Sequence, residues 1–138
     1  MATKTTSLLL LILLLSAGVA LASPGDSTHG HGTASTVGSF VFDAKETGSG
    51  TVTGKVRFGT LSIDIDVNCL IISGNTAIIG GTDVVSPSTT YAFKVTDNGG
   101  GATADRITLP QVGQTCATFN TLGSFALTSG DIEVHDLP

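Results

Sequence analysis

Apolar and polar residues alternate along most of the chain after Gly38. The pattern is clearest at residues 63–68, IDIDVN, where Ile63, Ile65 and Val67 would share one face of a strand. Val, Ile, Thr and Phe dominate such stretches, and glycines separate them, which is typical of strands joined by turns. The pattern predicts an all-β domain whose strands are Ser39–Ala44, Thr51–Phe58, Leu61–Ile72, Thr76–Thr82, Thr90–Asp97, Asp105–Leu109, Thr115–Phe119, Ser124–Leu127 and Asp131–His135.

The second and third of these strands form the best-defined predicted hairpin. A two-residue loop at Gly59-Thr60 would suit a type II′ turn, because glycine comes first. That loop places Phe58 opposite Leu61 on an apolar face and Lys55 opposite Asp64 on a polar face. We therefore expect an antiparallel sheet with one face in solvent.

The alternation stops after Cys69. A turn at Gly74-Asn75 would pair Ile71 with Ile78, and both faces of this hairpin are then apolar. A later segment that Cys116 brings close would cover the second face, and this is the interpretation we favour. Alternatively, the face binds a partner, and its residues are then Leu70, Ile72 and Ile79.

The first 22 residues have the features of a secretory signal peptide. Lys4 is followed by an apolar run at Leu8–Leu15, which is too short to span a membrane, and small residues at Ala20 and Ala22 form a cleavage site. Residues 23–37 are small and polar and predict a flexible Gly/Ser/His leader. Residues 38–138 would then form a single β domain, with no membrane span in the mature chain and an extracytoplasmic location.

Charge and cysteine content narrow the class of protein. The formal net charge is −5, and the few basic residues are scattered, so a nucleic-acid partner is not expected. Cys69 and Cys116 predict one disulfide, although two free thiols or an intermolecular bridge would also use them. We expect a monomeric antiparallel β-sandwich, with a flattened β-barrel as the alternative.

Two groups of acidic residues are candidate cation ligands. Asp97 and Asp105 flank a Gly-rich loop and offer hard oxygen atoms to Ca²⁺. Glycines occupy the loop positions where further ligands would lie, so a plain turn is the preferred interpretation. Asp64, Asp66 and Asn68 share one strand face, and such residues usually keep a face in solvent. No metal or other cofactor is therefore expected.

The histidines form no strong predicted site, and no known catalytic motif occurs in the sequence. His29 and His31 lie in the predicted leader and make a poor metal site there. His135 shares a strand face with Glu133 and would form an exposed pair. The sequence has no G-x-S-x-G, H-E-x-x-H or P-loop motif, so no catalytic residue is predicted and an enzyme is not expected.

Five segments resemble small secreted bacterial β-domains of the post-COAP type. They are GSFVF at 38–42, GTVTG at 50–54, CLIISGNTAIIGG at 69–81, VTDNG at 95–99 and GDIEVHD at 130–136. The resemblance implies an extracytoplasmic all-β domain of uncharacterised function, and it supplies no catalytic residues.

Together these patterns favour a secreted, non-catalytic binding or structural module with an unknown partner in the extracellular space or cell envelope. Two other functions stay open. One is a Ca²⁺-stabilised adhesion or carbohydrate-associated module, and the other is a small extracellular hydrolase.

Overall fold

The computed structural model describes residues 25–99, 104–120 and 123–137, and these residues form an all-β fold without an α-helix. The predicted signal peptide lies outside the described residues. No helix in the described ranges is long and apolar enough to cross a membrane. The strands are β1 (Ser27–Ala34), β2 (Gly38–Glu46), β3 (Val52–Phe58), β4 (Ile63–Ser73), β5 (Thr76–Asp83), β6 (Thr90–Thr96), β7 (Arg106–Thr108), β8 (Gln111–Val112) and β9 (Ser124–His135).

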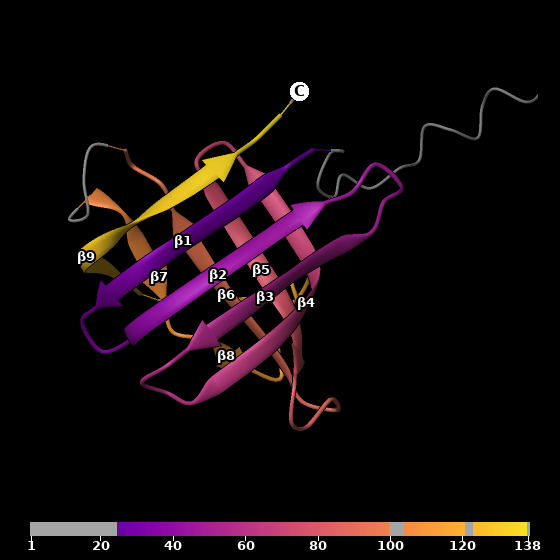
Figure 1. Cartoon of the computed structure of the whole chain (residues 1–138), viewed down its shortest axis with the longest axis horizontal. Helices are drawn as coiled ribbons and strands as arrows, with labels where there is room; N and C mark the ends of the chain where they lie inside the picture. Colours follow the sequence, from indigo (N-terminus) through magenta and orange to yellow (C-terminus); the bar gives the residue numbers. More distant parts are fainter. Residues whose placement is uncertain (1–24, 100–103, 121–122, 138) are drawn as a thin grey trace, which may run out of the picture.

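All strand pairings are antiparallel, and the sheet closes on itself. The order is β5-β4-β3-β2-β1-β9-β7-β6, and β6 then pairs with β5, while the short β8 adds to β6 beside β7. In Figure 1, β9, β1, β2 and β3 form the near wall, and β5, β6 and β7 cross behind them. The fold is therefore an eight-stranded barrel, the predicted alternative, and not the sandwich that was preferred.

β1 closes the barrel, and it lies within residues 23–37. The prediction of a flexible leader there is therefore wrong for Ser27–Ala34. β1 pairs with β2 on one side and with β9 on the other, along most of its length. Its inward positions hold only small side chains, including Thr28, Gly30 and Ala34, so they gave no apolar signal. A Cβ at Gly30 would lie 2.8 Å from the ring of Phe42, so the missing side chain makes room for that ring.

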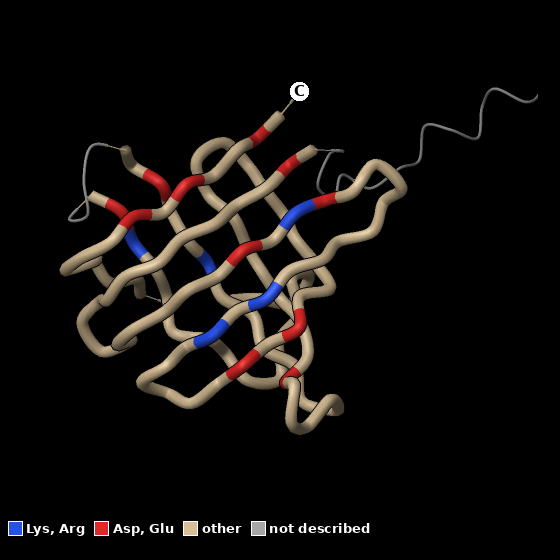
Figure 2. Tube along the Cα trace, in the orientation of Figure 1, with Lys and Arg blue, Asp and Glu red and all other residues tan. Residues whose placement is uncertain are grey.

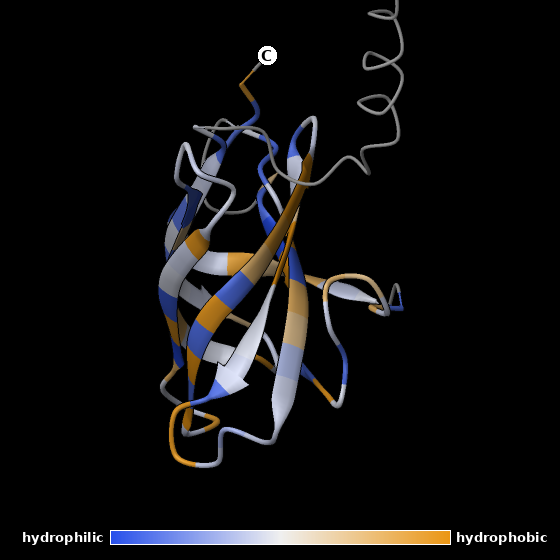
Figure 3. Cartoon of the chain, turned by 90° about the vertical axis from the view of Figure 1, so that its right-hand side faces the viewer, coloured by the Kyte–Doolittle hydropathy of each residue, from blue (hydrophilic) through white to orange (hydrophobic). Residues whose placement is uncertain are grey.

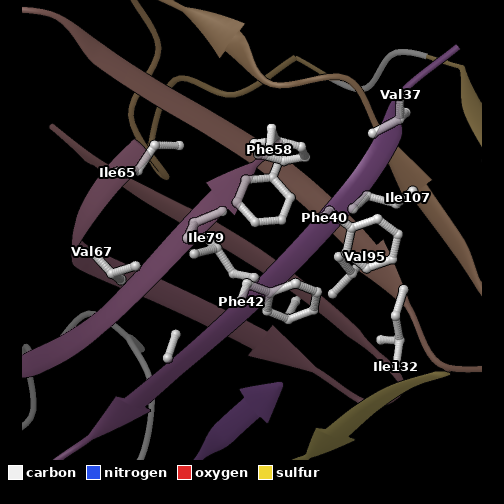
Figure 4. Packing of buried hydrophobic residues seen from close by; sticks show 14 of the residues in the cluster. Val37, Phe40, Phe42, Phe58, Ile65, Val67, Ile79, Val95, Ile107 and Ile132 are labelled. Carbon is white, nitrogen blue, oxygen red and sulfur yellow. The ribbon is translucent and has the colours of Figure 1, made fainter. Parts of the chain in front are cut away.

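The barrel interior is filled by side chains from both walls (Figure 4). Phe93 of β6 makes edge-to-face contacts with Phe58 and Phe42, with ring centroids 5.0 and 5.7 Å apart. Phe40 stacks on Phe42 at 6.0 Å. A barrel of this size has an interior that side chains can fill, and here they form one continuous core.

The hairpin of β3 and β4 has the predicted faces but a different register. Lys55 pairs with Asp66 and Phe58 with Ile63, so the strands are shifted by two residues from the prediction. The loop is longer than expected, and Ser62 adopts a positive φ of 56° in it. An even shift keeps every side chain on its predicted face, because the period of a strand is two.

A bulge in β4 explains why the alternation stops. The pairing of β4 with β5 shifts between Val67 and Cys69, which leaves Asn68 as the extra residue. Beyond the bulge, Ile71 pairs with Ile78, as predicted. β4 also separates from β3 after Asp66 and continues only against β5.

The C-terminal part of the predicted strand list needs two corrections. Residues 115–119 form a turn, in which the amide of Thr115 donates to Oγ1 of Thr118 at 2.9 Å, and they do not form a strand. The two last predicted strands are one continuous strand, β9, whose pairing with β1 runs through Gly130 although this glycine has a positive φ of 101°.

The outside of the barrel follows the predicted alternation. Apolar and polar positions alternate along several strands in Figure 3. Along the described chain, basic residues lie singly or in a small group with acidic residues near them (Figure 2). They form no continuous stripe among the described residues. Lys55 pairs with Asp66, and Arg57 lies 3.3 Å from Asp64.

Candidate functional site

The two cysteines form the predicted disulfide. Cys69 follows the bulge in β4 and Cys116 lies in the turn after β8, with their Cα atoms 6.1 Å apart. Gly80 of β5 lies against the disulfide. A Cβ atom at this position would lie 2.7 Å from Sγ of Cys69. The two cysteines are 47 positions apart in the sequence. A disulfide is compatible with an extracytoplasmic location.

The residues predicted as a partner face do not form an exposed surface. Leu70 and Ile79 are buried in the barrel interior, and Ile72 packs against the same core. Past the bulge, the outward positions are those of Cys69 and Ile71, and the turn that carries Cys116 approaches Ile78 on this side. The assignment of a partner face to Leu70 and Ile79 is therefore wrong, because both side chains point inward.

A groove of about 320 Å³ lies where β3 and β4 separate. Its walls include Val52, Leu70, Ile71 and both cysteines of the disulfide, so most of the lining is apolar. Volumes of this size are at the lower end for small-molecule sites. The separation of two neighbouring strands thus produces a concave surface on an otherwise filled barrel.

Glu46 supplies the acidic group of this groove. It is the last residue of β2, points inward and is only 6% exposed. Its Oε1 atom is buried and has no hydrogen-bond partner among the described residues. A buried polar atom without a partner costs about 1–3 kcal/mol, and a ligand that displaced the groove wall enough to donate a hydrogen bond to this oxygen would remove that cost.

Asp97 and Asp105, the predicted Ca²⁺ candidates, use both of their carboxylate oxygens on backbone amides. Asp105 is fully buried and accepts from the amides of Asn98 and Ile132, each at 2.9 Å. Asp97 accepts from the amides of Gly99 at 2.9 Å and of Val134 at 3.0 Å. These bonds fasten the loop after β6 to the last strand, which gives both residues a structural role.

Glu133 and His135 form the predicted exposed pair, and His29 joins them on the outer face of β1 and β9. His29 and His135 each place Nε2 at 3.3 Å from Oε2 of Glu133. His29 was predicted to lie in a flexible leader, so its approach to His135 was not predicted. The other histidine of the predicted leader, His31, is exposed on the same strand and lies outside this cluster.

The remaining predicted ladder does not act as a unit. Asp64 and Asp66 each face a basic residue on β3, and Asn68 is the extra residue of the bulge. Glu46, in contrast, was missed, because the predicted strand ended at Ala44. The period-two series Phe40, Phe42, Ala44 would have placed the next inward side chain at Glu46.

No family model matches the chain, and no match was found among curated proteins or solved structures.

Proposed function

We propose that the protein is a secreted, non-catalytic binding module, and that the groove beside the disulfide holds its ligand. The observation that carries this proposal is the buried Oε1 of Glu46, which has no partner and lines a mostly apolar groove. A ligand with an apolar body and an N–H donor, such as an alkylammonium group, would bury its body against Val52 and Ile71 and donate to this oxygen.

The composition of the groove supports binding over catalysis. Glu46 is the one titratable side chain among its described lining residues, since both cysteines are in the disulfide. Most glycoside hydrolases need a pair of carboxyl groups. The resemblance to secreted β-domains of the post-COAP type agrees with a role outside the cytoplasm.

Titration of the ¹⁵N-labelled protein with hexylammonium, hexanol and hexanoate tests the proposal. Hexylammonium is expected to shift the amide signals of Asn68, Cys69 and Ala117, while hexanol binds at least tenfold more weakly and hexanoate does not bind. The substitution Glu46→Gln should weaken hexylammonium binding at least tenfold. The control Asp131→Asn removes an exposed carboxylate of β9 and should leave it unchanged. If hexanol and hexylammonium bound equally well, the carboxylate of Glu46 would not contribute to ligand binding.

The stability of a second variant gives an independent measurement. Glu46→Met replaces a carboxylate, of which Oε1 has no partner among the described residues, by an apolar side chain of similar length. We expect it to raise the free energy of unfolding by about 1–3 kcal/mol while it abolishes ammonium binding, because the unpaired polar atom destabilises the free protein. A loss of both stability and binding would mean that Glu46 has a structural partner.

A further inference from the structure

The pairing of β1 with β9 fixes the relative positions of His29, Glu133 and His135. His29 lies directly opposite Glu133 in the register, and His135 follows two residues later on the same face of β9. Figure 1 shows β1 between β2 and β9 in the near wall of the barrel. The cluster therefore rests on the backbone of two paired strands, which hold it more firmly than a loop would.

The distances within the cluster suit a metal ion. Nε2 of His29 and Nε2 of His135 each lie 3.3 Å from Oε2 of Glu133, and the ligand atoms of all three residues lie within 4.8 Å of one another. Metal–ligand bonds of about 2.0–2.1 Å at tetrahedral angles place neighbouring ligand atoms about 3.3–3.4 Å apart. Two of the three spacings thus match a coordination shell, and the third, between the ligand atoms of the two imidazole rings, is no more than 4.8 Å.

The surroundings leave room for an ion and for water. The side chains of His29, Glu133 and His135 are 54%, 47% and 50% exposed, so solvent reaches the point on which they converge. The two imidazole rings are offset, with centroids 6.0 Å apart and planes inclined at 28°. Three protein ligands with one face open to water is the pattern of zinc sites that keep an exchangeable position.

We propose that His29, Glu133 and His135 form a surface site for a divalent transition metal ion of the Zn²⁺ type. Two imidazole nitrogens and one carboxylate oxygen select such ions over Ca²⁺ and Mg²⁺, which prefer sets of oxygen atoms. Water occupies the remaining coordination position. This site shares no residue with the groove that contains Glu46, so it stands independently of the proposed ligand.

Isothermal titration of the untagged protein with ZnCl₂ tests the site, with CaCl₂ as the hard-ion comparison. One Zn²⁺ per chain is expected to bind, and Ca²⁺ is not expected to compete at a hundredfold excess. His29→Ala and His135→Ala should each weaken Zn²⁺ binding at least tenfold. The matched control is His31→Ala, which removes an exposed histidine of the same strand and should change the affinity less than twofold.

A spectroscopic titration with Co²⁺ covers the case in which an alanine variant unfolds. In the intact protein, bound Co²⁺ should give the visible absorption bands of a tetrahedral site, and Glu133→Gln should remove them while the circular dichroism spectrum stays unchanged. The proposal is overturned if His31→Ala weakens binding as much as His29→Ala does, if Zn²⁺ fails to bind, or if Ca²⁺ displaces Zn²⁺.

Discussion

The substitution Asp105→Asn tests whether the hydrogen bonds of one buried carboxylate hold the end of the barrel together. Asp105 is fully buried, and its two oxygens accept from the amides of Asn98 and Ile132 at 2.9 Å. An asparagine side chain has one acceptor oxygen and one NH₂ group. Whichever way it is oriented, one backbone amide loses its acceptor and faces another donor.

The expected cost follows from these two bonds. A hydrogen bond to a charged group contributes about 1.5–3 kcal/mol, and a buried amide left without a partner costs about 1–3 kcal/mol. Asp105→Asn should therefore lower the free energy of unfolding by about 3–5 kcal/mol. For a domain of this size the midpoint of thermal unfolding would fall by roughly 12–20 °C.

Urea and thermal unfolding followed by far-ultraviolet circular dichroism measure this effect, with Asp131→Asn as the exposed control. A loss below about 1 kcal/mol would refute the reasoning, because that is the size expected of a surface substitution. Addition of CaCl₂ to the metal-free protein should leave the midpoint unchanged. If CaCl₂ raised the midpoint by as much as Asp105→Asn lowers it, a bound Ca²⁺ ion and not the amide bonds would stabilise this loop.

Three further variants test the fold. Replacing both Cys69 and Cys116 by serine should lower stability by about 4 kcal/mol in urea unfolding, because the unfolded chain loses a cross-link that closes a long loop; a change below about 1 kcal/mol would argue against the cross-link. Gly30→Ala should cost about 1–3 kcal/mol in the same assay, since its Cβ would collide with the ring of Phe42; an unchanged midpoint would show that the ring moves freely. Lys55→Ala should cost less than about 1 kcal/mol, because its ion pair is exposed, and a larger loss that persists in high salt would contradict that view.

The period-two pattern was sufficient to predict most strands and the faces of their side chains. It failed where closure of the barrel replaces large apolar residues by small ones. The inward positions of β1 include Thr28, Gly30 and Ala34, and the ring of Phe42 fills the space at Gly30. A strand of this kind resembles a polar linker until its two neighbours are known.

The candidate sites could be predicted only in part, because they depend on register. The disulfide followed from two cysteines in a chain with a predicted signal peptide. The approach of His29 to Glu133 could not be predicted, since the two residues are far apart in sequence and meet only when β1 pairs with β9. The missing partner of Glu46 is a property of packing, which a residue pattern does not contain.

The pairing of β1 with β9 joins segments about a hundred residues apart, so the barrel stays open until β9 has been synthesised and has paired with β1. Edges exposed at that stage invite pairing with other chains. An ion bound by His29 and His135 would cross-link β1 and β9, the pair of strands that forms last. It would slow their separation without changing the hydrophobic core.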